Sequence, residues 1–456
     1  MKFIYSMFNK LLLLMTLFFV QFEVVAQSNA PYSYKGIGNR NSTTNPVFSG
    51  MGNQFVSYAM PSVLNTGNAA SYSFLRHQFP IFSIGLANRV SFNEENGNTE
   101  INPKSTISEI AFGLSFSKRF GLAFGLKPMF DKSYSFTQKG TLLTDSIRYD
   151  YLGNGSLNKA FIGFSVKILN YDSLQWSIGG NFGSLFGSTN DQRRSAIINT
   201  LTNAGGGDIR TQQVRSFHYD LGTIIKFRLG DGNRFTIGGT FEPIQQIRST
   251  YSKEFFYSLS DVSNTNSWET LTYSGENKGK ITFAPSYNLG ISYSKRLVSH
   301  KKNGNERNSE LMVSASYSST DWSKYKEKYS DSTHSYNFNK STGFQIGIQY
   351  TPETQYIGNA MPKFFDRSSY RVGFYNNTLP YIYNNSQLTE SAVTIGFGFP
   401  MLVDRRLDSS IQLGFAAGKR GTTDAGAFNE KFIAFNIGFL IAPSINDRWF
   451  VKRKLD

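Results

Sequence analysis

Few side chains in this 456-residue sequence are of the kinds that carry out catalysis or hold a metal ion. Cys is absent, so the chain has no thiolate ligand, no Cys nucleophile and no disulfide. The four His are His77, His218, His300 and His334, and no two of them have the spacing of a metal-binding pair. We therefore expect no metal site and no cofactor.

His218 and Asp220 are the one pairing that could support acid–base chemistry. Residues two apart point to the same face of an extended strand, and a membrane hydrolase needs such a His beside a Ser or an Asp. The alternative is a polar pair that faces the interior of a β-structure and packs against another segment. We favour this second interpretation and expect no enzymatic activity.

A side-chain period of two indicates which elements position these residues. The stretch FIAFNIGFLIAP, residues 432–443, alternates bulky apolar residues from Ile433 onward with small or polar ones such as Asn436 and Gly438. Such alternation is typical of an extended strand with one apolar face. The pattern recurs back to about Phe82 and predicts fourteen strands. They are expected near 80–92, 107–118, 120–136, 156–168, 174–187, 215–229, 234–247, 279–295, 309–318, 342–352, 369–377, 388–401, 409–419 and 428–442.

Two features favour a membrane barrel over a soluble β-protein. The second face of the strands carries Gly, Ser and Asn, where a soluble sandwich would carry Lys, Glu and Thr. Tight connections alternate with longer ones, at 188–214, 248–278 and 319–341, as they do in outer-membrane barrels. We predict an all-β fold, a 14-stranded antiparallel transmembrane β-barrel in the Gram-negative outer membrane, with both termini in the periplasm.

The start of the chain and its charge indicate the compartment and the surroundings. A basic start, the apolar run LLLLMTLFFV and small residues before Gln27 predict a signal peptide over residues 1–26, cleaved after Ala26. The alternative, a membrane anchor, needs about 20 apolar residues, and this run is shorter. The net charge of +15 comes from basic residues scattered through the predicted loops. We expect them to meet solvent, membrane lipid and lipopolysaccharide, and we expect no nucleic-acid partner.

Residues 27–78 break the strand alternation. They are rich in Gly, Asn and Ser, with dispersed Tyr, Phe and Met. A periplasmic tail, the alternative, would be more charged and less aromatic. The lumen of a fourteen-strand barrel is intermediate in width between that of small barrels, which side chains fill, and that of porins, which hold an open channel. Left empty, such a lumen would leak. We predict a folded hatch inside the lumen at 27–78, then the barrel at 79–442 and a basic periplasmic tail at 443–456.

The hatch segment also carries a family resemblance. The stretches APYSYKGIGN, SGMGN and NTGNAASYSFL, with the basic ending RWFVKRKLD, resemble the FadL-type long-chain fatty acid transporter superfamily, especially its Bacteroidetes barrels. The resemblance implies fourteen strands and an N-terminal hatch that ends in an Asn-Pro-Ala motif. The matching residues are Asn68, Ala69 and Ala70, so Ala69 replaces the Pro, which would make the turn less rigid.

For function, the resemblance implies passive uptake of hydrophobic, fatty-acid-like compounds that leave the barrel sideways at a kinked third strand. Pro128 stands in the middle of the third predicted strand, in LKPMF. Proline cannot donate to the ladder and marks a bulge or a broken edge, although a Pro at a strand end in a loop is the alternative. Pro285 predicts a second break.

One long connection carries a helical pattern, and the resemblance gives it a role and adds a second possible function. Residues 190–204, NDQRRSAIINTLTNA, are expected to form a short loop helix capped by Asn190, with Ile197, Ile198 and Leu201 on one side. In the family, loops of this region form an outer site that captures hydrophobic molecules, and the alternative is a helix that packs its own loop. FadL-like barrels also serve as subunits of the type 9 secretion apparatus. A second function is therefore an accessory barrel with a protein partner in a secretion complex.

Overall fold

The computed structural model describes most of the region in which strands are predicted. It describes residues 31–41, 45–95, 98–142, 145–198, 203–300, 306–352, 363–383, 385–403, 406–422 and 429–442. The predicted signal peptide (1–26) and the predicted tail (443–456) lie outside these residues, as do the first residues of the predicted hatch. All statements of absence or number below refer to the described residues.

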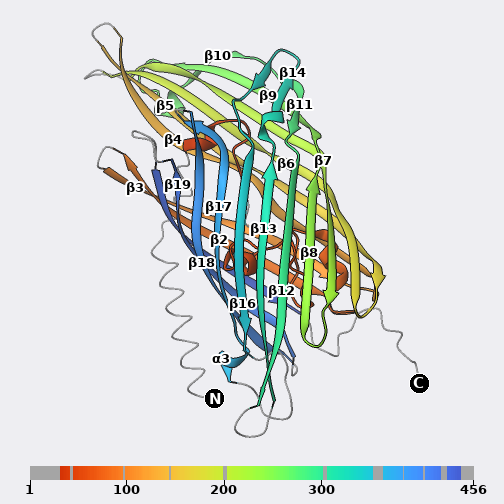
Figure 1. Cartoon of the computed structure of the whole chain (residues 1–456). Coiled ribbons are helices and arrows are strands. Elements are labelled where there is room, and N and C mark those ends of the chain that lie inside the picture. Colours follow the sequence, from red (N-terminus) through yellow and green to blue (C-terminus); the bar gives the residue numbers. More distant parts are fainter. Residues whose placement is uncertain are drawn as a thin grey trace.

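The strands form one antiparallel sheet that closes on itself as a barrel (Figure 1). Among the described residues, fourteen strand passages cross the wall, because β8 and β9 are the halves of one kinked strand, as are β11 and β12. The wall consists of β2 (Ile81–Glu95), β3 (Asn98–Leu114), β4 (Phe120–Leu142), β5 (Asp145–Asn170), β6 (Leu174–Ile198), β7 (Gly205–Arg228), β8 (Asn233–Glu242), β9 (Gln245–Ser258), β11 (Asn277–Phe283), β12 (Ser286–His300), β13 (Glu306–Thr320), β16 (Ser341–Thr351), β17 (Ser369–Tyr383), β18 (Ser386–Val403), β19 (Arg406–Gly421) and β20 (Asn429–Ile441).

The barrel closes between its first and last strands. β2 pairs with β20 from Phe82↔Ile441 to Glu94↔Asn429, while consecutive strands pair in order around the remainder of the wall. The predicted all-β, fourteen-strand fold is therefore confirmed. Several strands run further than expected toward the end with the longer connections. β6 and β7 pair from Leu174↔Phe227 to Ala196↔Gly205, so most of the loop predicted at 188–214 is strand.

The predicted helix at 190–204 is wrong. Residues 190–198 continue β6, where Asn190 pairs with Asn154 on one side and with Thr211 on the other. A few apolar residues at helical spacing cannot outweigh a ladder that satisfies the backbone on both edges. Leu201 lies outside the described residues.

Outward and inward side chains alternate as the sequence predicts. On β16, Phe344, Ile346 and Ile348 are exposed on the outer face, while Gln345 and Gln349 are buried inside. Apolar residues on other strands continue this outer band around the wall, as expected for a face that meets lipid. The outer face meets lipid and the inner face meets the polar lumen, which explains why apolar and polar side chains alternate along each strand.

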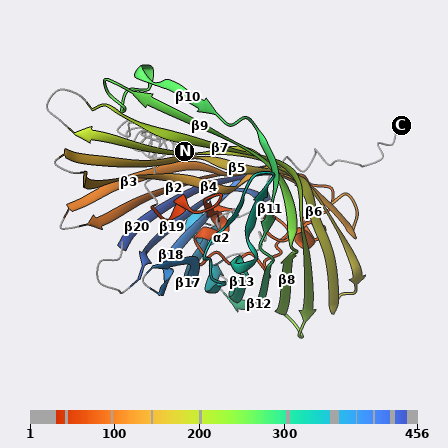
Figure 2. The ribbon, with the colours of Figure 1, turned by 90° about the horizontal axis from the view of Figure 1, so that it is seen from above.

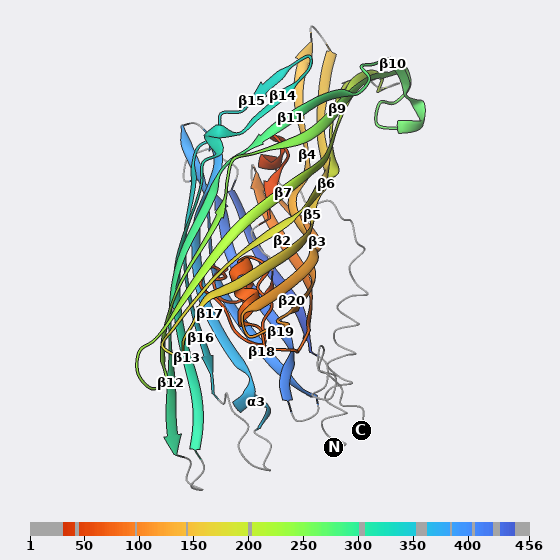
Figure 3. The same cartoon turned by 90° about the vertical axis from the view of Figure 1, so that its right-hand side faces the viewer.

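Short elements lie at the barrel ends and in the lumen. The wall extends beyond the band at one end, where β9 and β10 project sideways (Figure 3). No helix among the described residues is long and apolar enough to cross a membrane. The short elements are β1 (Asn39–Arg40), β10 (Glu269–Tyr273), β14 (Lys326–Tyr329), β15 (Thr333–Ser335), η1 (Pro31–Tyr34), η2 (Ala69–Phe74), η3 (Thr265–Ser267), η4 (Trp322–Lys324), α2 (Pro46–Ser49) and α3 (Phe364–Arg367).

The described N-terminal residues, 31–41 and 45–78, lie inside the ring of strands (Figure 2). Val47, Phe48, Met51 and Leu64 are fully or nearly fully buried in one apolar cluster with Tyr72. Polar contacts then attach this segment to the wall. The Tyr72 hydroxyl donates to Asn181 Oδ1 at 2.7 Å, and the Tyr58 hydroxyl donates to Gln349 Oε1 at 3.2 Å.

A belt of inward-facing glycines lets the N-terminal segment approach the wall. On Gly238, an added Cβ would overlap the carbonyl oxygen of Val56, and on Gly179 it would lie 2.7 Å from the carbonyl carbon of Ala69. All spanning strands except β13 contribute one such glycine at this level. They are Gly85, Gly113, Gly121, Gly163, Gly179, Gly222, Gly238, Gly290, Gly347, Gly373, Gly396, Gly414 and Gly438.

The position of the apolar band can be tested by placing a charge in it. Ile395 is 49% exposed on the outer face of β18, and Leu271 is 64% exposed on β10, in the part that extends beyond the band. We expect Ile395→Arg to lower the free energy of unfolding in bilayers by about 2–4 kcal/mol. Leu271→Arg should change it by about 0.5 kcal/mol or less, because its side chain meets water. Equal losses would contradict this placement of the membrane.

The glycine belt can be tested with two adjacent residues. Gly238 faces the N-terminal segment, whereas a Cβ on Gly239 would lie no closer than 3.4 Å, to Thr223 Cγ2. We expect Gly238→Ala to destabilise the folded barrel by about 1–3 kcal/mol through overpacking, and Gly239→Ala to be nearly neutral. Denaturant unfolding of the two variants provides the measurement. A neutral Gly238→Ala would mean that the segment does not pack tightly there.

Candidate functional site: an opening in the wall and two lumenal cavities

The wall has a gap in its hydrogen bonding between β3 and β4. These strands pair only from Ile110↔Leu126 to Leu114↔Leu122. Beyond that point β3 stays paired with β2, and β4 stays paired with β5, so that both facing edges lose their ladder. Ile101 and Ile107 on this part of β3 are 61% and 50% exposed. The gap therefore lies at the level of apolar outward-facing residues.

Pro128 lies inside β4, where the two strands separate. The alternative of a proline in a loop is therefore wrong. The register between β4 and β5 shifts between Pro128 and Phe130, which leaves Met129 as the extra residue of a bulge. The missing N–H of the proline and the bulge together turn β4 away from β3. Pro285 makes the second break, between the end of β11 and the start of β12.

A short piece of the N-terminal segment covers the free edge of β4. In β1, Asn39 pairs with Asp131 and Arg40 pairs with Phe130, and the amide of Asn41 donates to the carbonyl of Met129 at 2.9 Å. Gly38 precedes these residues with φ +96°, where a side chain would also overlap the backbone of Asp131. β1 thus supplies in part the hydrogen bonds that β3 would otherwise provide.

Three side-chain contacts hold this arrangement together. Lys104 of β3 forms an ion pair with Asp131 of β4 and so bridges the gap. Arg40 forms an ion pair with Glu242 on the opposite wall, and the Tyr381 hydroxyl donates to Asn39 Oδ1 at 2.7 Å. Both residues of β1 are therefore fixed by their side chains as well as by their backbone.

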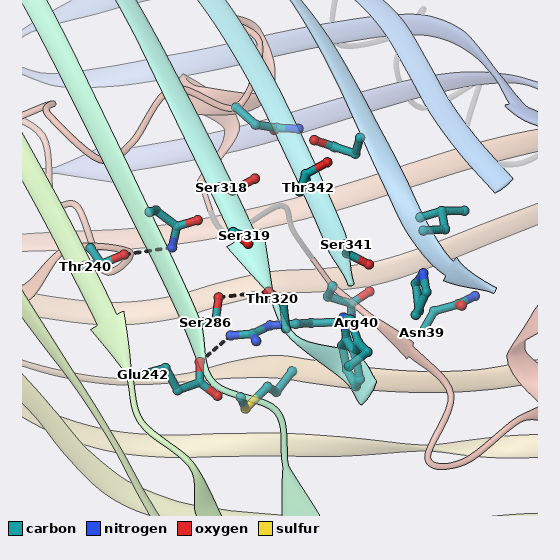
Figure 4. Close-up of a pocket in the computed structure, with 18 of the residues that line it drawn as sticks. Asn39, Arg40, Thr240, Glu242, Ser286, Ser318, Ser319, Thr320, Ser341 and Thr342 are labelled. Carbon is teal, nitrogen blue, oxygen red and sulfur yellow. Dashed lines mark hydrogen bonds and ion pairs between the residues drawn. The ribbon is translucent and has the colours of Figure 1, made fainter. Parts of the chain in front are cut away.

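Two cavities lie on either side of residues 39–41. The larger has a volume of about 290 Å³, and Ile37, Met129 and Trp322 are among the residues that line it. Figure 4 shows many of the Ser and Thr side chains that also line it. The smaller has a volume of about 150 Å³ and reaches Lys104 and Asp131 at the gap. Pro128 and residues 39–41 line both cavities. β1 therefore borders both an inner chamber and a vestibule that reaches the wall opening.

Aromatic side chains line one side of the larger cavity, and we call this side its aromatic roof. Trp322, Tyr325 and Phe338 pack with Phe130 and Phe283 in one buried cluster that includes Ile37. The hydroxyl of Tyr325, in the connection between β13 and β14, donates to Glu327 Oε1 at 2.8 Å. Burial, and then the charge of Glu327, raises the pKa of Tyr325 well above its usual value. Tyr325 therefore stays neutral and remains a donor in this roof.

Several charged groups that line the larger cavity are paired with each other. Asp220 forms an ion pair with Lys159 and accepts from Asn181 Nδ2 at 2.8 Å. His218 Nε2 lies 3.0 Å from Glu242 Oε1, and Glu242 also binds Arg40. Pairing of this kind offsets the cost of taking charges out of water.

His218 and Asp220 both face the lumen, but each has a different partner. No hydrogen bond joins them among the described residues, where no group of three acidic, His or Cys side chains could hold a metal ion either. Through Glu242–Arg40 and through Asn181–Tyr72, they connect the wall to the N-terminal segment. Their arrangement favours positioning over catalysis.

Asn68, Ala69 and Ala70 form a fully buried corner of the N-terminal segment. Asn68 caps η2 by accepting from the amide of Ala70 at 3.1 Å. Its amide group donates to the carbonyls of Val56 at 2.7 Å, Thr223 at 3.3 Å and Gly239 at 3.4 Å. Ala69 begins the helix against Gly179. One side chain thus fixes the segment to both β7 and β8.

Ile197 and Ile198 lie at the exposed end of β6. Neither lines the two cavities described above. Their role in capturing hydrophobic molecules stays a prediction, and it no longer has a helix to support it.

Sequence reasoning missed the contacts that hold β1 in place. Lys104 and Asp131 stand 27 residues apart, and Arg40 and Glu242 stand 202 apart. Neither pair has a local pattern, because each depends on the three-dimensional course of strands that do not follow one another. Only the proline in LKPMF pointed to this region.

Comparison with known proteins agrees with this fold. The model of the BamG family matches residues 7–456, which is nearly the whole chain. The chain belongs to the BamG family. No curated protein matches it.

Solved structures share the barrel of this BamG-family chain. A Pseudomonas aeruginosa FadL homologue is 11% identical with a TM-score of 0.53, and the P. putida toluene transporter TodX is 12% identical with a TM-score of 0.52. The CymD monoaromatic hydrocarbon channel is 14% identical with a TM-score of 0.52. Each match covers 88% of this chain and 98% of the other. The expected FadL-type resemblance is thus confirmed for the fold.

The buried corner at Asn68 can be tested by separating its two roles. Asn68→Ala removes both the cap and the donors, and it should cost about 1–3 kcal/mol. Asn68→Ser keeps an acceptor for the Ala70 amide but cannot reach the three carbonyls, so that we expect an intermediate loss. Hydrogen exchange over residues 65–75 gives the local free energies of opening. A serine variant as stable as the wild type would mean that only the cap matters.

Proposed function

We propose that this BamG-family barrel is an outer-membrane channel for the passive uptake of hydrophobic compounds, including long-chain fatty-acid-like molecules, and that they leave sideways between β3 and β4. The observation that carries the proposal is the unpaired stretch of wall at β3 and β4. A transmembrane wall normally pairs all its backbone groups, since lipid offers them no hydrogen bonds. An incomplete ladder at apolar depth therefore favours a function that needs an exit there.

The proposed path leads from the aromatic roof through the larger cavity to the vestibule. Trp322, Phe338 and Met129 offer apolar contact in the first chamber, and Pro128 borders both chambers. The side chains that close the vestibule toward lipid are Lys104 and Asp131. A hydrophobic molecule gains by leaving into the bilayer, because each methylene kept out of water contributes about 0.8 kcal/mol.

β1 is the element that we expect to move. Only two residues pair with β4, whereas the wall strands pair over much longer stretches. The following segment, 45–75, is fixed by the apolar cluster and by Asn68, so that it can stay in place while β1 detaches. Residues 39–41 border both cavities, so that displacing them would widen the passage from one to the other.

A second candidate is a FadL-like accessory barrel that serves as a subunit of a protein secretion complex of the type 9 kind. The observation that favours it is the polar, ion-paired lining of a cavity of about 290 Å³, at the lower end of ordinary ligand pockets. A barrel whose lumen is filled and held by ion pairs is suited to a structural role. In that case the sideways exit would have no cargo.

The exit can be tested by closing it covalently. Because the natural chain has no Cys, Lys104→Cys with Asp131→Cys introduces the only thiols, one on each side of the gap. A bifunctional maleimide should join them and reduce uptake of a fluorescent fatty acid by cells to the level of a strain without the barrel. The matched control is Glu254→Cys with Thr270→Cys, whose side chains are in contact (Thr270 Oγ1 to Glu254 Oε1, 2.6 Å) on the already paired β9 and β10 and line neither cavity.

The control should keep its uptake after cross-linking. Unchanged uptake in a fully cross-linked Lys104→Cys/Asp131→Cys barrel would reject sideways release. If the wild-type barrel itself gives no uptake, and lipid extraction of the purified protein yields no apolar ligand, the channel proposal is rejected. The accessory-barrel candidate would then be preferred.

A further inference from the structure

A row of four cations crosses the outer face of the wall on β7, β9, β11 and β14. Arg248 pairs with Lys280, and Lys280 pairs with Lys328. Arg215 completes the row, because the preceding Val214 pairs with Ser249 next to Arg248. All four side chains are exposed. We call Arg215, Arg248, Lys280 and Lys328 the basic row.

No acidic side chain neutralises the basic row. Among the described residues, none of the four takes part in an ion pair, and Lys280 Nζ donates only to Gln246 Oε1, at 3.3 Å. The nearby Glu327 points inward, where it is buried and paired with Arg210. Like charges on neighbouring strands repel each other. The row is therefore costly for the barrel alone, and an anion placed against it would remove that cost.

The row lies beside two shallow hollows in the outer surface. One, of about 760 Å³, is lined by Phe186, Gln213, Lys278 and members of the basic row. The other, of about 640 Å³, is lined by Phe217, Tyr219 and Ile244. Arg215 and Arg248 line both hollows, so that a basic surface continues into an apolar one.

A kink in the wall explains the apolar hollow. β7 pairs with β9 up to Val214 and with β8 from Leu221 onward, so that residues 215–220 have no ladder on this side. The strand breaks at Pro243 and Ile244, and the side chain of Gln245 replaces the missing bonds. It accepts from the amide of Tyr219 and donates to its carbonyl, each at 2.9 Å. The Gln245 side chain thus takes the place of a ladder partner for the Tyr219 backbone where the wall recedes.

The basic row also lies at the edge of the apolar band. Phe217 is 61% exposed and stands two residues from Arg215 on β7, and Ile244 is 54% exposed and stands four residues from Arg248. The row belongs to the end with the longer connections, which faces the cell exterior in outer-membrane barrels. Cations at such a boundary lie at the depth of lipid headgroups.

We propose that the basic row binds the phosphates of a phosphorylated glycolipid of the outer leaflet, of the lipopolysaccharide type. Its acyl chains would lie against Phe217, Tyr219 and Ile244. Neighbouring strands are about 4.8 Å apart, so that four cations span roughly 14 Å, which is enough for a headgroup with more than one phosphate. Arg is well suited to phosphate because its planar group donates two parallel hydrogen bonds. A soluble anion would gain nothing from the apolar hollow. This site does not depend on the proposed transport.

The test uses the full-length barrel in phosphatidylcholine nanodiscs with lipid A as the probe. Arg215→Gln, Arg248→Gln and Lys280→Gln together should weaken retention of bisphosphorylated lipid A by about a hundredfold, since each cation near an anionic surface is worth about a factor of five. The matched control removes three exposed cations at the other end of the wall, with Lys118→Gln, Arg228→Gln and Lys295→Gln. It should bind like the wild type.

Four results would overturn the proposal, the first three of which concern the variants and lipid A. They are retention by the triple variant equal to that of the wild type, an equal loss in the control, and equal binding of dephosphorylated lipid A. Equal retention of phosphatidylglycerol would also reject it, because a single phosphate would then suffice. Migration of the unheated variants in gels monitors folding, and Lys280→Gln alone, expected to give a fivefold loss, is the milder variant.

Discussion

Backbone amides and carbonyls at the depth of a bilayer have no water to bond with, so each strand edge in this wall must find a partner. The barrel meets that requirement by an ordinary ladder around most of its circumference and by closure of β2 on β20. Between β3 and β4 it meets the requirement differently. A bulge beside Pro128 turns β4 away, and two residues of β1 take the place of the missing strand. The cavities, the ion pairs around β1 and the proposed exit all follow from that substitution.

The N-terminal segment combines a fixed part with a lightly held part. Residues 45–75 fit against a belt of glycines, where the wall has no side chains to keep them away. Ile37 is buried in the aromatic cluster, but residues 39–41 contact the wall through one short ladder and a few side chains, chiefly Arg40 with Glu242 and Tyr381 with Asn39. Regions with few buried contacts open at lower free energy than the core around them. The packing of 45–75 and the few contacts of 39–41 are therefore what the proposed movement of β1 depends on.

Four buried or half-buried carboxylates inside the barrel are ion-paired, whereas the basic row outside is not. Inside, Asp220, Glu242, Glu390 and Glu430 each lie in an ion pair with a basic side chain. Outside, the basic row has no acidic partner on adjacent strands. Pairing stabilises these groups because they are largely buried, and a buried charge without a partner is costly. An unpaired row at a membrane boundary can be neutralised by the surroundings, and an outer membrane offers phosphates there.

Much of the fold could be predicted from the sequence. The period of two fixes which side chain faces lipid and which faces the lumen, because an extended chain allows no other arrangement, and Phe344 and Gln345 follow it. It also predicted fourteen strands. Strand ends were less predictable: the run at 190–198 contains apolar residues at helical spacing, yet the pairing of Asn190 with Asn154 and Thr211 made it strand. Hydrogen bonds to a neighbour outweigh local preference.

The sequence by itself determined the class of fold, the faces of its strands and the proline at which β4 bends, since these depend on spacing and on the missing N–H of Pro128. Only the tertiary structure shows which residues meet at that bend, where β4 leaves β3 and β1 takes its place. The pairing of Arg40 with Phe130, the bridge from Lys104 to Asp131 and the alignment of Arg248 with Lys280 join residues from separate parts of the chain. Their proximity depends on the closure and stagger of the whole barrel, and no local pattern of residues encodes that geometry.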